Sequence, residues 1–217
     1  MTRKHSLPRF PDDYLGDKAR EYDNLTWMER NQRKTTLRCV KYLFDPKLGE
    51  YEKADNSNYL ILDLGCGSGF STEELLNLGF NVIGIDILKD MLMKAYQKKS
   101  KSNFKTREEL ILASILNLPI KPQKIDFIIS ISAYNFITYK KTDIYSVKNV
   151  LNETARRLFL LLKEKGRAVI EFYPNNQKEL KLHLDSFKNN NFTGFFIKDN
   201  PQQKGGQTFL LLKKEAE

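Results

Sequence analysis

Apolar residues fall along this chain in short, nearly continuous runs that alternate with longer stretches of helical spacing. Nearly continuous apolar runs are typical of strands that are buried on both faces of a sheet. Five such runs predict strands, at residues 61–64, 81–86, 109–115, 125–132 and 167–173. Two further runs, 192–198 and 207–212, predict a pair of adjacent strands that closes the chain.

Between these strands, apolar residues recur at every third or fourth position, which predicts amphipathic helices. The clearest case is 144–162, after which Gly166 follows as a stop signal. A second helix is predicted after Pro174. His183 falls beside the apolar stripe of that helix, so we expect it at the surface.

Strands that alternate with helices indicate an α/β fold with a doubly wound, Rossmann-like parallel sheet, and the last two strands suggest an antiparallel pair at one edge. Residues 1–50 precede the first strand and have a helical pattern around 27–43. We therefore expect a helical N-terminal arm at 1–50 over a ligand cleft, and the α/β domain that contains the sheet at 51–217. At 217 residues, with no internal repeat or low-complexity linker, the chain fits one domain.

A glycine-rich turn follows the first strand, in the sequence Ile-Leu-Asp-Leu-Gly-Cys-Gly-Ser-Gly at 61–69. Glycine lacks a Cβ, so Gly65 and Gly67 allow a sharp turn that brings bare backbone against a ligand, where a side chain would occupy the ligand's space. Ser71 and Glu74 have the spacing of a capping box, which predicts a helix that starts directly after the turn.

This turn does not fit a dinucleotide site. The NAD fingerprint needs glycine or alanine at its sixth position, whereas Phe70 or Thr72 stands there, depending on which glycine begins the count. Asp63 would repel a pyrophosphate but would stabilise a cationic sulfonium or ammonium group. The second strand ends in Asp86, about 20 residues after the first glycines, where a carboxylate reaches ribose hydroxyls. These features predict an S-adenosylmethionine site.

The formal net charge of +9 and a pI of about 9.4 favour binding to polyanions such as nucleic acid. Basic residues cluster at 94–107 and at 140–148, with aromatic residues interleaved among them. Bases of single-stranded RNA stack on aromatic side chains, so both segments predict RNA surfaces. The clustered cations are Lys94, Lys98, Lys99, Lys101, Lys105 and Arg107 in the first segment, and Lys140, Lys141 and Lys148 in the second.

Other residue patterns exclude several classes of protein. No apolar run approaches the roughly 20 residues of a membrane span, and no secretory signal follows the basic start. The two cysteines, Cys39 and Cys66, and the two histidines offer neither a disulfide framework nor metal-ligand spacing. We therefore expect an intracellular protein without a metal, and a small buried thiol rather than a nucleophile at Cys66.

Residues 129–136, Ile-Ser-Ile-Ser-Ala-Tyr-Asn-Phe, resemble the Ile-Ser-Ile-Ser-Ala-x-Gln-Trp motif of the small-subunit ribosomal RNA (guanine-N7) methyltransferases of eukaryotes and archaea. The resemblance covers nearly the whole chain and implies a class I methyltransferase fold, S-adenosylmethionine as cofactor, and methylation of guanine N7 in small-subunit rRNA during ribosome assembly. Further segments that are similar to the family lie at 3–8, 19–22, 62–69, 166–169 and 173–176.

The glycine turn and the resemblance together imply a cofactor site. Tyr22 in the arm would close over the methionine moiety. Ser114 stands where family members commonly have an acidic residue that holds the adenine amine, so we expect a weaker or backbone-mediated contact there. The cofactor residues expected are Tyr22, Asp63, Gly65, Cys66, Gly67, Gly69, Asp86, Ile87, Ser114, Ile115 and Ser130.

Methylation of guanine N7 needs no general base, because N7 has a free lone pair and no proton, so catalysis would come from positioning. We expect Tyr134 and Phe136 against the base and Asn135 on one of its polar edges. Tyr173, with Pro174, would form the opposite lip. Because N7 lies in the narrow major groove of A-form RNA, the target base must be unpaired or flipped out.

The resemblance also implies a partner, a small zinc-binding adaptor that activates several methyltransferases by covering an exposed sheet edge. The apolar run 110–113 is a candidate place for it, because an uncovered edge strand is a pairing hazard. We expect the protein in the cytoplasm, or also in the nucleus of a eukaryote. Open alternatives are a small-molecule methyltransferase acting on a quinone or lipid precursor, a tRNA or protein target, and an assembly factor whose methyl transfer is dispensable.

Overall fold

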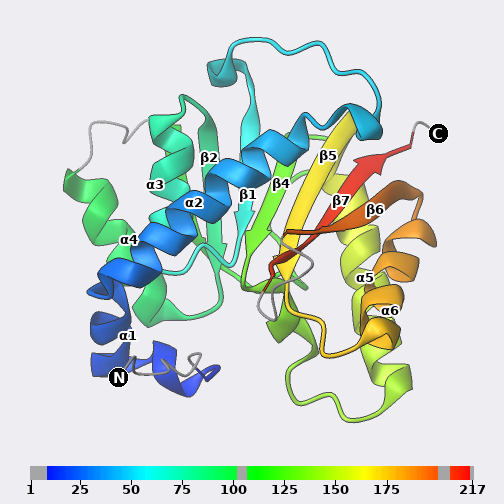
Figure 1. Cartoon of the computed structure of the whole chain (residues 1–217). Coiled ribbons are helices and arrows are strands. Elements are labelled where there is room, and N and C mark those ends of the chain that lie inside the picture. Colours follow the sequence, from blue (N-terminus) through cyan, green and yellow to red (C-terminus); the bar gives the residue numbers. More distant parts are fainter. Residues whose placement is uncertain (1–8, 102–106, 200–205, 216–217) are drawn as a thin grey trace.

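The computed structural model describes residues 9–101, 107–199 and 206–215. The strands in this part of the chain are β1 (Leu60–Leu64), β2 (Asn81–Asp86), β3 (Glu108–Leu112), β4 (Ile125–Ile131), β5 (Leu162–Phe172), β6 (Phe192–Lys198) and β7 (Thr208–Lys214). They form a seven-stranded sheet in the order β3-β2-β1-β4-β5-β7-β6 (Figure 1).

The sheet is parallel from β3 to β5, and β7 runs antiparallel between β5 and β6. The predicted doubly wound sheet with an antiparallel pair at one edge is confirmed. Asp63 in β1 pairs with Gly84 in β2 and with Ile129 in β4, so these parallel strands end at the same level. The loops that follow them therefore meet at one edge of the sheet, where α/β proteins bind ligands.

Helices cover both faces of the sheet, and α1 packs on α2 and α4. The α-helices of the described residues are α1 (Gly16–Asp23), α2 (Thr26–Leu43), α3 (Phe70–Asn77), α4 (Lys89–Lys101), α5 (Ile144–Leu161) and α6 (Gln177–Lys188). Helix α2 crosses the front face in Figure 1, and α2 and α3 bury Leu43 and Leu75 against that face. Helices α5 and α6 bury Leu151, Leu158 and Phe187 against the other face. Within the described residues, no helix is long and apolar enough to span a bilayer.

Arg167 in β5 ties the segment after α2 to the sheet. Its buried guanidinium donates to the carbonyl oxygens of Leu43 at 2.9 Å, Gly49 at 2.8 Å and Glu50 at 3.2 Å. It also lies 4.7 Å from the ring centroid of Tyr51. Burying a guanidinium is costly unless its donors are bonded, so these contacts fix the path of the chain between α2 and β1.

Two local predictions were wrong. Helix α5 ends at Leu161 and runs directly into β5, so Gly166 is not its stop but lies in β5, where a Cβ would approach a backbone oxygen at 2.8 Å. His183 is 1% exposed rather than at the surface. Its ring packs 4.9 Å from that of Phe172, because α6 packs against both α5 and β6.

Candidate active site

A cavity of about 330 Å³ opens where the carboxyl ends of β1, β2, β3 and β4 meet. The loops after these strands and the N-terminal segment line it. The predicted site residues in its lining are Tyr22, Gly65, Cys66, Gly67, Asp86, Ile87, Ser114, Ile115 and Phe136. The predicted site residues outside the lining are Asp63, Gly69, Ser130, Tyr134, Asn135 and Tyr173.

The three glycines of the turn have left-handed backbone, with φ of +72° at Gly65, +56° at Gly67 and +89° at Gly69. A Cβ at Gly65 would overlap the Cβ of Ala133, and one at Gly69 would lie 3.0 Å from that of Ala95. At Gly65 a side chain would therefore collide with the protein, which corrects the expectation that it would take the ligand's space, and at Gly69 it would crowd α4. Glycine lets the turn pack directly on the loop after β4 and on α4.

The capping box expected at Ser71 and Glu74 is not formed. Gly69 is the N-cap residue of α3, and no side chain caps the helix. Ser71 instead donates from Oγ to Oδ2 of Asp63 at 2.6 Å, and Glu74 accepts a hydrogen bond from Arg33 at 3.2 Å. Both side chains that the local spacing assigned to the cap therefore bond to residues outside α3 instead.

Asp63 lies beneath the turn, fully buried. Its Oδ2 accepts from Ser71 and from Thr72, at 2.6 and 2.8 Å, while Oδ1 has no partner. The Oγ of Ser68, in the cavity lining, is likewise buried without a partner. Burial raises the pKa of Asp63 to about 6. Buried oxygens without partners suit a ligand that brings N–H donors.

Asp86 ends β2 and faces the cavity. Its two carboxylate oxygens accept backbone N–H groups, from Gly67 at 2.9 Å and from Leu88 at 2.7 Å. Burial raises the pKa of Asp86, and these bonds oppose that rise. Each oxygen keeps lone pairs for further donors, so the carboxylate can also bind ligand hydroxyls.

The part of the cavity beside β3 is apolar. Ile87, Ile115 and Leu116 line it, and Ser114 is its polar member there. The Oγ of Ser114 accepts the Leu116 N–H at 3.2 Å, which leaves its hydroxyl proton for another acceptor. A flat ring system fits between such side chains, with few charged groups to hold it.

Two predicted site residues are used inside the protein. Ser130 is buried and donates to the carbonyl oxygen of Leu64 at 2.9 Å, which joins β4 to β1. Tyr134 begins the short helix η5 (Tyr134–Thr138) and is fully buried, with its ring 5.8 Å from that of Phe187. It therefore cannot lie against a base in the cavity.

Asn135 also has a different role from the one expected. Its Nδ2 donates to the Tyr173 carbonyl at 3.1 Å, and its Oδ1 accepts the Tyr173 N–H at 3.0 Å. Both polar groups that we expected on a base edge instead fix the chain after β5. Tyr173 is 43% exposed and outside the lining, with its hydroxyl 3.5 Å from Oγ of Ser132, which lines the cavity.

Phe136 reaches the cavity, and three aromatic residues that the sequence did not assign to it join it there. Phe10 stacks on Phe136, with ring centroids 4.4 Å apart and 15° between the planes. Tyr139 meets Phe10 edge-on at 5.2 Å, and Tyr14 lies 6.1 Å from Phe136. The available signal was the spacing of aromatic residues at 10, 14 and 22 in an arm expected over the cleft.

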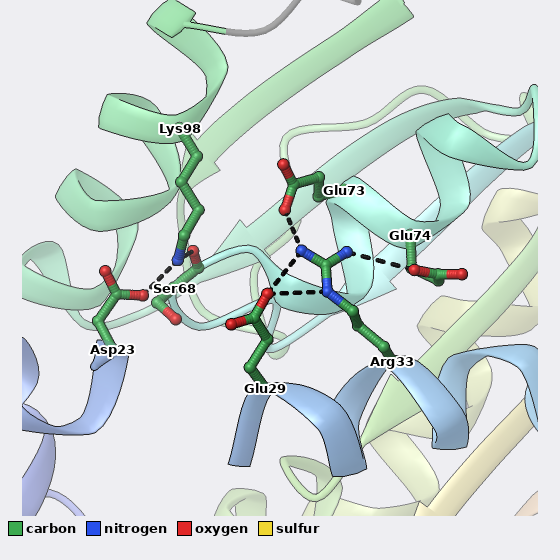
Figure 2. A network of polar contacts seen from close by, with 7 residues as sticks. All are labelled: Asp23, Glu29, Arg33, Ser68, Glu73, Glu74 and Lys98. Carbon is green, nitrogen blue, oxygen red and sulfur yellow. Dashed lines mark hydrogen bonds and ion pairs between the residues drawn. The ribbon is translucent and has the colours of Figure 1, made fainter. Parts of the chain in front are cut away.

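Charged residues tie the N-terminal helices to the glycine turn (Figure 2). Lys98 on α4 binds Asp23 of α1 and donates to the carbonyl oxygen of Ser68 at 2.8 Å. Arg33 on α2 forms ion pairs with three carboxylates, Glu29 on its own helix and Glu73 and Glu74 on α3. The segment that carries Tyr14 and Tyr22 is thereby attached to the turn that it covers.

The basic segment 94–107, predicted to be an RNA surface, uses three of its cations in contacts within the protein, while Lys101 is exposed. Besides Lys98, both Lys99 and Arg107 donate to backbone carbonyl groups of the protein, and Lys105 lies outside the described residues. The lysines of the segment 140–148 are exposed, and Lys141 belongs to the cavity lining.

Comparisons with known proteins agree with this geometry. A family described as "Methyltransferase domain" matches residues 55–209. An 18S rRNA (guanine-N(7))-methyltransferase of Schizosaccharomyces pombe is 30% identical over 215 residues, which cover 98% of this chain and 74% of that protein. The enzyme of that name from Bos taurus is 32% identical over 208 residues, which cover 94% of this chain and 68% of the bovine protein. Magnesium protoporphyrin IX methyltransferase from Synechocystis, solved with bound S-adenosylmethionine, has a TM-score of 0.59 at 18% identity, covering 93% of this chain and 98% of that one.

S-adenosylmethionine fits the residues present. The Asp86 carboxylate suits ribose hydroxyls, the unpartnered Ser68 oxygen in the lining suits a cationic methionine end with the buried Asp63 carboxyl beneath the turn, and the apolar wall suits adenine. The predicted fold, cofactor and family are confirmed. This chain is an S-adenosylmethionine-dependent methyltransferase and belongs to the family of the 18S rRNA (guanine-N(7))-methyltransferases.

Proposed function

We propose that this protein methylates N7 of an unpaired guanine in small-subunit rRNA during subunit assembly. The observation that carries the proposal is the aromatic group in the cavity lining, formed by Phe10, Tyr14, Phe136 and Tyr139. Aromatic faces bind extruded bases by stacking. The relatives that match nearly all of this chain are 18S rRNA (guanine-N(7))-methyltransferases, which supports the same acceptor.

The cofactor supplies a methyl group on a positively charged sulfur. Guanine N7 carries no proton, so no side chain of this protein has to remove one. The residues act by placement: the glycine turn and Asp86 hold the cofactor, Tyr22 covers its methionine end, and Phe136 holds the plane of the base. A lone pair aimed at the methyl carbon then reacts by proximity.

The N-terminal arm, residues 1–50, serves in this proposal as a cover for the cofactor, and 51–217 form the methyltransferase domain. The support is that Tyr14 and Tyr22 line the cavity with ring centroids 5.2 Å apart, and that Lys98 ties α1 to the turn. A cover that excludes water strengthens the attraction between carboxylates and a cationic ligand.

The RNA backbone would approach beside the cavity, at the start of α5. Exposed Lys140 and Lys141 precede this helix, and Tyr145 in its first turn is 72% exposed. Lysines bind phosphates without regard to sequence, and an exposed tyrosine offers a face to a neighbouring base.

The adaptor belongs to the same proposal. β3 is an edge strand of the described sheet, paired with β2, and its Leu112 is 54% exposed. An exposed apolar edge favours the addition of a strand from a partner, here a small zinc-binding adaptor. The place of action would be the cytoplasm, or the nucleus in a eukaryote.

The test is to incubate the protein, the adaptor and small-subunit particles with methyl-labelled S-adenosylmethionine. Label is then mapped by cleavage chemistry that is selective for N7-methylguanine. We expect label at one guanine of the small-subunit rRNA and its loss with Asp86→Asn. Label on another base, on tRNA, on protein, or only on a small molecule such as a quinone precursor would overturn the proposal.

The same variant distinguishes the proposed enzyme from an assembly factor whose methyl transfer is dispensable. If methyl transfer matters for assembly, cells that carry Asp86→Asn should accumulate unfinished small subunits. Normal assembly with an inactive enzyme would make the chain a scaffold that binds the cofactor.

A further inference from the structure

Glu171 is a carboxylate buried directly behind the cavity wall. It lies in β5, opposite Ile131 of β4, and has no exposed surface. Its Oε2 accepts from Ser132 Oγ at 2.7 Å, and its Oε1 accepts from Gln207 Nε2 at 3.1 Å. No ion pair to Glu171 is present in the described part of the chain. A buried acid held by neutral donors alone is costly to maintain, so a structural role is a poor account of it.

Ser132 is the residue through which Glu171 reaches the cavity. Ser132 belongs to the cavity lining and has left-handed backbone, with φ of +55°. Residues other than glycine adopt this conformation rarely, and such strain clusters where a side chain must be held for function. The hydrogen bond to Glu171 holds the strained residue in place.

The direction of that hydrogen bond determines what Ser132 can offer to a ligand. Burial raises the pKa of Glu171, and hydrogen bonds from Tyr173, Ser132 and Gln207 oppose that rise. In its ionised form Glu171 only accepts, so the hydroxyl proton of Ser132 then points to the carboxylate. The lone pairs that remain on Oγ can then only accept a hydrogen bond. The next hydroxyl, that of Tyr173, is 3.5 Å from Ser132 Oγ.

We propose that Glu171 is a positioning residue which, through Ser132, gives the methyl-acceptor end of the cavity an oriented hydrogen-bond acceptor with a negative charge behind it. This rests on the proposed function. Guanine brings N–H donors on its N1 and its exocyclic amine. As the bond from N7 to the methyl carbon forms and the carbon–sulfur bond breaks, the positive charge passes from sulfur to the base, where a fixed nearby carboxylate stabilises it.

A double-mutant cycle tests the proposal, with single-turnover methylation of small-subunit particles as the readout. Glu171→Gln keeps the shape and removes the charge, and Ser132→Ala removes the hydroxyl. We expect each to slow methyl transfer about tenfold to a hundredfold, with cofactor affinity changed less than about twofold. The double variant should be no slower than Ser132→Ala, because Glu171 acts through Ser132.

Two matched variants separate positioning from folding. Ser132→Gly also removes the hydroxyl but relieves the left-handed strain, so it should fold more stably than Ser132→Ala and still be slow. Thr35→Val cuts the same polar network one bond further from the cavity, where Thr35 Oγ1 accepts from Gln207 at 2.8 Å, and should leave the rate unchanged. If Ser132→Gly restores the rate, or Thr35→Val slows it as much as Glu171→Gln, the effect is one of folding and the proposal is wrong.

The outcome also distinguishes this inference from the proposed function. A wild-type protein that labels no guanine N7 defeats the proposed function, and the inference with it. An active wild type with a full-rate Glu171→Gln variant, or losses that multiply in the double variant, defeats the inference alone.

Discussion

At the scale of single residues, Gly65 meets two demands that no other amino acid meets together. Its φ of +72° is left-handed, and a Cβ would overlap that of Ala133. Gly16 has a similar φ of +56°, but no atom lies within 4 Å of the place its Cβ would take. The two glycines therefore separate backbone strain from collision.

We predict that Gly65→Ala lowers the free energy of unfolding by about 3 kcal/mol or more, and Gly16→Ala by about 1 kcal/mol. Both variants strain the backbone, but only the first displaces the loop after β4. Urea denaturation measures both losses. Equal losses would contradict the close approach of the turn to Ala133.

The buried carboxyl of Asp63 makes stability depend on pH. Its pKa is about 6 in the folded protein against an ordinary 3.8, because it is buried. The folded state therefore keeps a proton that the unfolded chain releases, and the contribution of Asp63 to stability falls as pH rises from about 4 to about 6.

We accordingly predict that Asp63→Asn raises the unfolding free energy of the cofactor-free protein at pH 8 by up to about 3 kcal/mol relative to its effect at pH 4. The neutral amide has no proton to lose across this range. Urea titrations at the two pH values supply the comparison. An effect of the same size at both would show that Asp63 does not titrate in this way.

At the scale of elements, the strands were predictable because a nearly continuous apolar run is typical of a strand buried on both faces of a sheet. β2 has the predicted bounds, and β4 differs from its prediction by one residue. The capping box failed because Ser71 bonds to Asp63, a contact that forms only when the turn folds back on β1. Local spacing could not reveal that competition.

The cofactor half of the site followed from the sequence, since glycines and acids at strand ends have few other uses together. The acceptor half did not, because it depends on which way each side chain of η5 points. The Tyr134 ring packs inward against Phe187. The Phe136 ring faces the cavity, where it stacks on Phe10 of the N-terminal arm. No sequence pattern relates those two phenylalanines.

We predict that Lys98→Met speeds release of the cofactor by about tenfold, since the substitution removes the ion pair to Asp23 and the hydrogen bond to Ser68. The methionine keeps apolar contact with Phe70, over whose ring the ammonium lies at 4.1 Å. Stopped-flow fluorescence of Trp27, which packs in the same cluster as Tyr22, gives the release rate. Lys101→Met, an exposed change on the same helix, is the control. A similar acceleration with it would show that the contacts of Lys98 to Asp23 and Ser68 do not retain the cofactor.

At the scale of the whole molecule, the effect of the net charge of +9 on RNA binding depends on where the cations lie. Two lysines of α4, Lys98 and Lys99, are bound to the protein itself, whereas Lys140 and Lys141 are exposed beside the cavity. Lys121 and Lys124 are also exposed, but they precede β4 and therefore lie at the amino ends of the parallel strands, away from the cavity.

We predict that the double change Lys140→Glu and Lys141→Glu weakens binding to small-subunit RNA at least tenfold at about 150 mM salt and flattens its dependence on salt, since two phosphate contacts are lost. The matched change Lys121→Glu and Lys124→Glu has the same effect on net charge and should weaken binding much less. Filter binding over a salt series measures both. Equal losses would mean that overall charge, not this surface, attracts the RNA.

The most direct test of the central claim is calorimetric titration of the protein by S-adenosylmethionine and by S-adenosylhomocysteine. We predict saturable binding of both at one site, weakened at least tenfold by Asp86→Asn, which removes the charge facing the cavity, and unchanged by Asp126→Asn near the opposite sheet edge. A protein that binds neither compound, or binds them equally well after Asp86→Asn, would contradict the assignment of this cavity as the cofactor site.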